Sequence, residues 1–448
     1  MTDPETPGAD EDAEGAKPPE KTGGGTSASD KRALLTVWFT LFLDLVAFGI
    51  IIPVLPFYAE HFGAAVWQVT LLSTVFSLSQ FVMAPVLGRL SDRCGRRRIM
   101  LLSIAGATLS MLVLGLASAL WMVFAARLFN GACNANISTA HAYVADKTAP
   151  SERAKYMGMM GAAIGIGFVV GPIIGGLLAL PTMPELPFLV AAGLGSLNLL
   201  MAFFWLPESL PRSRRGTAST ASTASVASTA SVASEGPAPA NAPHQRKRSL
   251  LALLGGEHRG TQIAALSLVA FGFYTAFANM ESSFALFTEA IYGWGARETG
   301  IFFTYIGVVI AVMQGAVVGP VVARLGERTT LFLGLGLMAV GLIAQGGVQS
   351  IGALLLGGGL IAAGNGLLNP SLNALVSRAS SESDQGLNMG IVQSASSLGR
   401  ITGPVFAGPI FELIAPGAPL IFAGVVVFVV LGVASRTIST PNGVGEGA

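Results

Sequence analysis

Four charged residues stand inside long apolar runs of this 448-residue chain, at Asp44, Arg127, Glu281 and Arg400. A charge in a hydrocarbon layer costs about 2.5–3.5 kcal/mol on insertion scales, so each is a functional candidate by default. Burial favours the neutral form of a carboxyl, and a nearby arginine favours its ionised form. We therefore expect Asp44, Arg127 and Glu281 to couple proton binding to the opening and closing of a cavity; static ion pairing is the alternative.

Polar residues accompany these charges at helical spacing. One stripe follows steps of 3, 4, 4 and 3 and so occupies one face of a helix: Arg127, Asn130, Asn134, Ser138 and His141. A second stripe, at steps of four, comprises Asn365, Asn369 and Asn373. We expect both stripes, with Tyr274 and Arg400, to line a wet substrate cavity. Hydrogen bonding between helices is the alternative for the asparagines.

The elements that carry these residues are apolar runs of about 18–25 residues, each long enough to cross a hydrocarbon core of about 30 Å. Charged residues make up only 11% of the chain, too few for a soluble domain. The expected fold class is an all-α membrane protein with twelve transmembrane helices. The expected spans are 34–56, 67–87, 99–117, 120–143, 157–180, 187–206, 262–286, 299–322, 329–349, 351–376, 388–412 and 417–435.

The positions of lysine and arginine test this span count. With twelve spans both termini lie on one side, and 23 of the 26 Lys and Arg residues then fall on that side. Arg127 and Arg400 lie within spans, and Arg297 lies in a loop on the other side. Because basic residues concentrate in cytoplasmic loops, we expect cytoplasmic termini and a location in the plasma or inner membrane.

The depth of the charges suggests a pairing. At 1.5 Å per residue, Asp44 lies about 15 Å from the cytoplasmic end of its span, and Arg127 lies about 10 Å from the outer end of its own. Their backbones then differ in depth by about one to two helical turns, which a long guanidinium can bridge. We therefore expect Arg127 to be the partner of Asp44, with Glu281 in nearly the same layer.

Segments outside the spans differ in composition. Residues 1–32 begin acidic and are rich in Gly and Pro, which predicts a disordered cytoplasmic tail and not a signal peptide. Residues 208–260 contain Ala-Ser-Thr and Ala-Ser-Val repeats between basic clusters, which predicts a flexible cytoplasmic linker; a regulatory docking site is the alternative. This linker separates a six-helix half at 33–207 from another at 261–436, and 437–448 forms a second tail.

Other function classes find little support in the sequence. A net charge of +1 provides no basic field for nucleic acid, and 4 His with 2 Cys cannot build a metal cluster or a disulfide framework. The motifs of serine hydrolases, zinc proteases and nucleotide-binding loops do not occur, and His141 with Asp146 is an isolated pair. We expect no enzyme activity, no cofactor and no metal.

The two halves repeat each other. A loop with matched glycines and arginines recurs at an offset of 231: Gly88, Arg93, Gly95 and Arg97 correspond to Gly319, Arg324, Gly326 and Arg328. A second element, which begins at Gly167 in span five, recurs from Gly399 in span eleven at an offset of 232. Duplicated halves with one offset are the architecture of carriers that bind their substrate between the halves.

These motifs resemble those of the major facilitator superfamily. The loop at 88–97 resembles its signature between helices two and three, and Arg127 with Gly131 resembles, in degenerate form, a second motif. The Gly-Pro-x-x-Gly-Gly element at 171–176 is similar to the motif of the antiporter branch. Asp44 followed by Pro-Val-Leu-Pro at 53–56 resembles the opening helix of tetracycline and multidrug exporters. The resemblance implies proton-coupled efflux, with spans one, four and seven lining the cavity.

The resemblance also implies roles for two motifs. The gating loop comprises Gly88, Asp92, Arg93, Gly95, Arg96 and Arg97, and its carboxylate is expected to face the start of span eleven near 387–390, at a positive helix end. Orientation of the loop by its positive charges alone is the alternative. The antiporter-type motif comprises Gly167, Gly171, Pro172, Gly175 and Gly176. Its glycines and proline predict close, bent helices that seal the cavity against proton leak, or simple helix packing.

We therefore expect a secondary active transporter that exports amphipathic drugs or small hydrophobic compounds in exchange for protons by alternating access. Its expected partners are a small-molecule substrate, protons and the lipid bilayer, with no nucleic acid, and the monomer is expected to be functional. Proton-coupled uptake of a metabolite is one alternative, and the antiporter-type motif argues against it. A non-transporting receptor or lipid-handling scaffold is another, and the embedded charges and duplicated halves argue against that.

Overall fold

The long elements of the chain are helices throughout the residues that the computed structural model describes, 28–134, 136–209, 258–381 and 384–438. The first group comprises α1 (Ala28–His61), α2 (Val66–Cys94), α3 (Arg96–Gly115), α4 (Leu120–Cys133), α5 (Asn136–Lys147), α6 (Pro150–Leu178) and α7 (Leu186–Trp205). The second comprises α9 (His258–Tyr292), α10 (Ala296–Val312), a π-helical turn at Met313–Val317, α11 (Val318–Gly347), α12 (Ile351–Ala379), α13 (Gln385–Leu413) and α14 (Ala418–Thr437). Most of the expected tails and linker lies outside the described residues.

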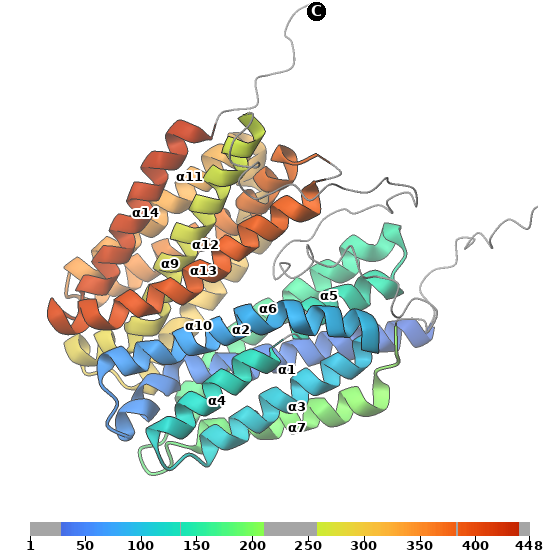
Figure 1. Ribbon diagram of the computed structural model, residues 1–448. Coiled ribbons are helices and arrows are strands. Elements are labelled where there is room, and N and C mark those ends of the chain that lie inside the picture. Colours follow the sequence, from blue (N-terminus) through green and yellow to red (C-terminus); the bar gives the residue numbers. More distant parts are fainter. Residues whose placement is uncertain (1–27, 135, 210–257, 382–383, 439–448) are drawn as a thin grey trace, which may run out of the picture.

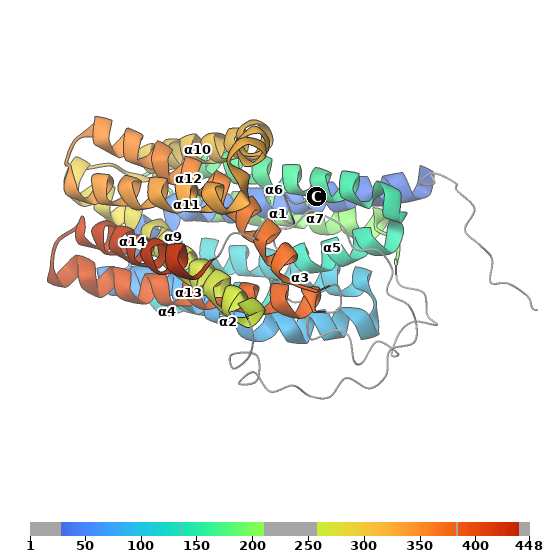
Figure 2. The same ribbon diagram turned by 90° about the horizontal axis from the view of Figure 1, so that it is seen from above.

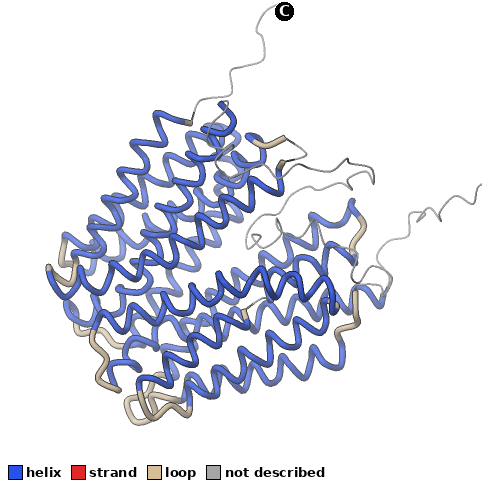
Figure 3. The backbone as a smooth tube through the Cα atoms, in the orientation of Figure 1, coloured by secondary structure: helices blue, strands red, loops and turns tan. Residues whose placement is uncertain are grey.

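The helices form two bundles that follow the order of the chain. Helices α1–α7, blue to green, pack together, and helices α9–α14, yellow to red, pack together (Figure 1). Short loops join successive helices within each bundle (Figure 3). Seen from above, the helices of both bundles run in roughly one direction (Figure 2). The largest buried apolar cluster lies wholly within the second bundle, around Phe273, Phe284 and Leu335.

The helices are long and apolar enough to cross a membrane. Among the described residues, nine segments meet this condition, and one of them, Ala296–Gly347, is 52 residues long and contains two passes. The backbone breaks within that segment at Gly326, whose φ of 76° is left-handed. Helix α13 spans 29 residues but carries a polar stretch at 393–400, and α4 and α5 share one pass. The expected all-α fold with twelve passes is confirmed.

The fourth pass differs from the expected continuous helix. Helix α4 ends at Cys133, Asn134 has φ −81° and ψ 82°, and α5 begins at Asn136. Asparagine side chains compete with the helical backbone for hydrogen bonds, which accounts for a break at this position. The predicted stripe from Arg127 to His141 is therefore split between two short helices.

Equivalent contacts confirm that the two halves repeat each other. Gly95 has φ 106° and Gly326 has φ 76°, and both stand just before a helical segment. The guanidinium of Arg97 donates to the carbonyl oxygen of Phe203 (2.6 Å), and that of Arg328 donates to the carbonyl oxygen of Ser435 (3.2 Å). Both carbonyls belong to the last helix of their half.

An ion pair repeats between the halves with its charges exchanged. Arg96 lies 3.4 Å from Asp146 in the first half, whereas Glu327 lies 2.6 Å from Arg378 in the second. The positions correspond at offsets of 231 and 232. Each pair joins the helix that follows the repeated loop to another helix of its own bundle. The two halves therefore share the ion pair, although the acidic and basic residues have exchanged positions.

Glycines bring the first helix of each half close to the fifth. A Cβ atom added at Gly171 of α6 would lie 2.6 Å from the Cα atom of Gly49 on α1. At the equivalent Gly403 of α13, an added Cβ would lie 2.8 Å from the backbone nitrogen of Asn279 on α9. Such distances leave no room for a side chain, so these glycines allow direct backbone packing.

The bundles meet at one end and diverge at the other. They diverge toward the terminal face, defined as the end at which α1 begins and α14 ends (Figure 1). Near the opposite face the backbone N–H of Trp67 donates to Glu412 Oε1 (3.2 Å), and the hydroxyl of Thr304 donates to the carbonyl oxygen of Val169 (3.3 Å). Gly176 of α6 packs there against the start of α10. The space between the bundles is therefore sealed at the opposite face.

Candidate functional site

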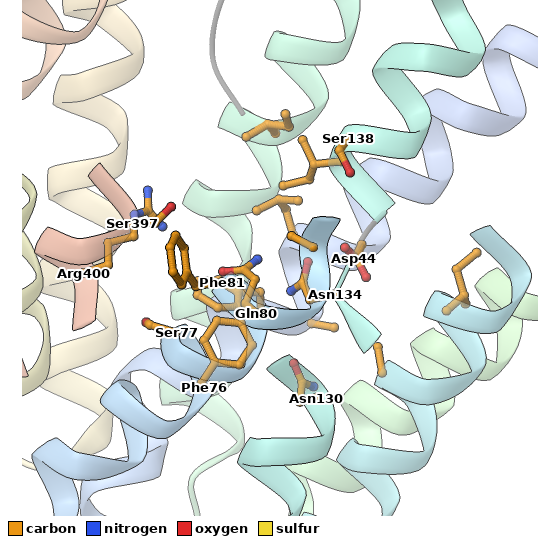
Figure 4. Close-up of a pocket in the computed structure, with 18 of the residues that line it drawn as sticks. Asp44, Phe76, Ser77, Gln80, Phe81, Asn130, Asn134, Ser138, Ser397 and Arg400 are labelled. Atoms are coloured by element: carbon orange, nitrogen blue, oxygen red, sulfur yellow. The ribbon is translucent and has the colours of Figure 1, made fainter. Parts of the chain in front are cut away.

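A cavity of about 600 Å³ lies between the bundles. Helices α1–α7 supply most of its wall, and α13 supplies the facing part (Figure 4). Five sequence-predicted residues lie in this lining: Asp44, Asn130, Asn134, Ser138 and Arg400. Asp44 and Arg400 thus bring opposite charges into one cavity from different bundles. A volume of this size accommodates a drug-sized organic molecule.

Asp44 is held by an amide that the sequence analysis did not single out. The side-chain nitrogen of Asn136 donates to Asp44 Oδ1 at 3.0 Å. Asn136 is the first residue of α5 and its side chain is buried, whereas Asp44 is half-buried at the cavity wall. A hydrogen bond to the ionised carboxyl favours that form, and the surrounding apolar residues oppose it. The carboxyl is therefore oriented and exposed to the cavity at the same time.

The expected pairing of Asp44 with Arg127 does not form. The guanidinium carbon of Arg127 lies 4.4 Å from the ring centroid of Phe76, and the side chain is only 4% exposed. Its Nε and Nη1 atoms have no hydrogen-bond partner among the described residues. The break after Cys133 separates Arg127 from the part of the fourth pass that reaches Asp44, so an aromatic face replaces the expected carboxylate.

Glu281 connects the charges of the two bundles. Its carboxyl interacts electrostatically with Arg400 and, more weakly, with Arg127. Neither arginine approaches it within the 4.0 Å of an ion pair in the described structure. Glu281 does not belong to the lining of the cavity described above.

The expected residues of the second half form a network behind Arg400. The hydroxyl of Tyr274 donates to Asn369 Oδ1 (3.0 Å), and the amide of Asn369 donates to Asn365 Oδ1 (2.8 Å). The guanidinium carbon of Arg400 lies 4.8 Å from the ring centroid of Tyr274. Of this group, only Arg400 lies in the cavity lining, so the asparagines support the wall and do not form it. Asn373 follows one turn later on α12, also outside the lining.

His141 has a local role. Its Nδ1 atom lies 2.8 Å from the carbonyl oxygen of Ile137, one turn earlier on α5, and the residue does not line the cavity. Ser138, one turn earlier on the same helix, does line it. The stripe predicted for the fourth pass thus reaches the cavity at Asn130, Asn134 and Ser138 only.

The predicted gating loop is mostly helix. Helix α2 continues through Gly88, Asp92 and Arg93 to Cys94, and only Gly95 leaves the helical conformation. Asp92 forms an ion pair with Arg96 (2.5 Å) one turn on. That its carboxylate faces the start of α13 stays a prediction.

Glu208 completes the anchoring of this segment. Its Oε1 atom accepts from the backbone nitrogen of Arg96 (2.9 Å), at the start of α3. A Cβ atom on Gly95 would collide with the same carboxylate. The terminal ends of α2, α3 and α7 therefore form one rigid unit with the Arg96–Asp146 ion pair.

The antiporter-type motif contributes packing within and between the bundles. Gly167, Gly171 and Gly175 pack against Leu45, Gly49 and Ile50 of α1, within the first bundle. Gly176 packs across the bundles, 2.9 Å from the carbonyl oxygen of Ala296 when a Cβ atom is added, and the carbonyl oxygen of Pro172 packs there against Gly300 of α10. The helix carries Pro172 without interruption. The motif therefore holds α1, which carries Asp44, in place.

Several lining residues escaped the sequence analysis. Gln80 and Phe81 on α2, and Gln393, Ser394 and Ser397 on α13, all face the cavity. The last three precede Arg400 at helical spacing, with steps of 1, 3 and 3, so the polar stripe of span eleven was readable. Gln80 is a lone amide in an apolar run, and a polar residue in such a run indicates a position that faces a cavity or another helix.

The family is decided by comparison with known sequences. The sequence model described as Major Facilitator Superfamily matches residues 37–317 and, again, 266–446. The chain belongs to this superfamily. The overlapping double match reflects the two similar halves. As a member of the superfamily, the protein is a multi-pass membrane transporter of small molecules and not an enzyme.

Its relatives within the superfamily include antibiotic-resistance proteins. The chain is 31% identical over 394 residues to the tetracycline resistance protein, class C, of Escherichia coli, covering 85% of this chain and 89% of the relative. It is 27% identical over 426 residues to the major facilitator superfamily domain-containing protein 10 of Mus musculus, covering 86% and 88%. The chain therefore spans nearly the whole length of these transporters.

Solved structures of the superfamily share the fold. The human organic anion transporter MFSD10 (TETRAN) has a TM-score of 0.65 and 26% identity, covering 91% of this chain and all of that one. A bacterial homolog of the human lysosomal transporter Spinster, in its inward-facing and occupied conformation, has a TM-score of 0.73 at 16% identity, covering 93% and 100%. The second likeness concerns the fold alone.

Proposed function

We propose that this superfamily member exports drug-sized organic compounds from the cytoplasm in exchange for protons. The observation that carries the proposal is a carboxyl group, Asp44, oriented by Asn136 at the wall of a cavity between the two bundles. Relatives named for tetracycline resistance and organic anion transport support an organic cargo of this size. The apolar rings in the lining suit such a cargo.

Sidedness follows from the charge pattern. By the order of the spans in the sequence, almost all lysine and arginine residues fall on the side of the terminal face, so we assign that face to the cytoplasm of an inner or plasma membrane. The bundles then diverge toward the cytoplasm, and the cavity is positioned to receive cargo from inside. In this state the contacts of Trp67 with Glu412 and of Gly176 with α10 close the outer side.

The proton site follows from the same arrangement. In the outward-facing state, Asp44 binds a proton from outside; after the bundles rock, it releases that proton to the cytoplasm as cargo enters. Glu281 is the second proton-coupling candidate, but it acts through Arg400 and does not line the cavity. Arg127 couples to Glu281 and not to Asp44. One chain contains the whole cavity, so the monomer is the proposed working unit.

Gating belongs to the segment at 88–97. With the terminal face open, Asp92 pairs with Arg96. We assign Asp92 to closure of this face, where approach of α13 would bring a positive helix end to the carboxylate.

The test is proton-driven cargo uptake into inverted membrane vesicles. Tetracycline serves as the probe cargo. Asp44→Asn keeps the shape of the side chain but removes its titration, so uptake should fall to the level of vesicles without the protein, while equilibrium binding of cargo persists. Glu281→Gln should retain part of the activity. Full uptake by Asp44→Asn would sink the assignment, and loss confined to Glu281→Gln would move the proton site to the second bundle.

A further inference from the structure

Arg400 is a cation fixed on an aromatic platform at the cavity wall. Its guanidinium carbon lies 4.8 Å from the ring centroid of Tyr274, whose hydroxyl is in turn bonded to Asn369. A guanidinium stacked on a ring keeps the N–H donors in its plane free for a planar anion. No hydrogen bond or ion pair of Arg400 is formed within the described residues. The donors are therefore positioned and open to the cavity.

The charges around Arg400 do not cancel. Glu281 is the carboxyl that interacts with Arg400, and it also interacts with Arg127. One glutamate thus serves two arginines, so this cluster keeps a net positive charge even when Glu281 is ionised. Arg89 adds a further cation to the cavity lining, whereas Asp44 is the one carboxylate among the lining residues. A cleft lined by an excess of cations attracts an anionic ligand.

The remainder of the lining suits an apolar body. Phe48, Phe76, Phe81 and Phe168 contribute rings to the wall of the cavity. Aromatic rings of a cargo can stack on such side chains while a single polar end is bound elsewhere. The cavity therefore has two chemically different sides: aromatic rings cover much of the wall, and α13 of the second bundle contributes a guanidinium.

We propose that the cargo is an aromatic organic acid whose carboxylate or sulfonate binds Arg400. This inference rests on the proposed function and adds the chemical class of the cargo. Arg400 forms the bidentate hydrogen bonds to the acid, Tyr274 fixes the guanidinium, and the phenylalanines hold the aromatic body. Export of a monoanion against entry of one proton carries two positive charges inward per cycle, so an inside-negative membrane potential drives export.

The test compares two probes of nearly the same shape, 2-naphthoate and its neutral amide, 2-naphthamide. Binding to the purified full-length protein is measured by titration calorimetry at neutral pH without any gradient. Wild type should bind the acid at least about tenfold more tightly than the amide, as a charge-assisted hydrogen bond implies. Arg400→Gln should lower affinity for the acid to that for the amide and leave amide binding unchanged, and Arg400→Lys should recover part of the preference.

Arg328→Gln is the matched control, because it removes a guanidinium that lies over an aromatic ring, that of Phe332 (5.3 Å), outside the cavity lining. It should keep the preference for the acid. Equal affinities of wild type for the two probes, or a preference that survives in Arg400→Gln, would overturn the proposal. Because the measurement uses no proton gradient, its outcome is independent of the Asp44→Asn uptake experiment, which tests export itself.

Discussion

Asp44 acts in this structure through its partner Asn136. A donor amide fixes the direction of the carboxyl. It does so without holding the carboxyl in its ionised form, as a paired arginine would. That distinction matters for the proposed role of Asp44, in which the carboxyl binds and releases a proton in every cycle. The guanidinium of Arg127, stacked on Phe76, is kept out of reach.

Asn136→Ala is expected to impair coupling without preventing folding. Loss of a hydrogen bond to a charged group costs about 1.5–3 kcal/mol, so proton-driven uptake should fall by roughly tenfold or more, with a shifted pH profile. Gln345→Ala is the control: it removes another buried amide hydrogen bond, to the carbonyl oxygen of Leu354, away from the cavity. Unchanged pH dependence in Asn136→Ala would contradict a positioning role.

Residue types were easier to predict than their partners. Asp44, Asn130, Asn134, Ser138 and Arg400 stood out as polar residues in apolar runs, and they line the cavity. Their contacts did not follow from sequence, because depth along straight helices was the only guide. The pass is divided after Cys133, and Asp44 is bonded by Asn136 at the start of α5 instead of by Arg127 on α4.

At the scale of elements, the glycines of α6 set how closely helices approach. Gly176 meets the start of α10 across the bundles, whereas Gly165, on the same helix, has open space where a side chain would be. The sequence predicted close packing from the spacing of these glycines. It did not reveal which glycine packs within a bundle and which packs between bundles.

Gly176→Ala should open the outer side. Its Cβ atom would lie 2.9 Å from the carbonyl oxygen of Ala296, and overpacking of this kind costs about 1–3 kcal/mol, at least about fivefold in the balance of states. Thr74→Cys is a suitable reporter, because Thr74 is buried and bonds Ile401 across the bundles (3.4 Å). In a background without Cys94 and Cys133, labelling by an impermeant maleimide from outside should rise.

Gly165→Ala should leave labelling unchanged. Asp92→Asn should lower it, because a weaker closure of the cytoplasmic face favours the state seen here. Equal labelling in all of these variants would show that neither contact controls the balance between the two states.

At the scale of the whole molecule, the duplicated halves share one framework, but the cavity between them is asymmetric. Repeated loops, repeated glycines and an ion pair with exchanged charges give the bundles the same framework. The cavity does not share this symmetry: the first bundle supplies Asp44 and most of the lining, and the second supplies Arg400 on α13. Apolar length predicted the twelve passes well, since bilayer thickness fixes it. The relative tilt of the bundles depends on cross-bundle contacts that no local pattern encodes.

The most direct test of proton-coupled export is a proton movement driven by cargo alone. Proteoliposomes that contain the purified protein, tetracycline and a trapped pH indicator are diluted into cargo-free buffer of equal pH. As cargo leaves, protons should enter and the lumen should acidify faster than in empty liposomes, and Asp44→Asn should abolish the difference. A lumen that turns alkaline, or that follows the empty liposomes, would contradict exchange of cargo for protons.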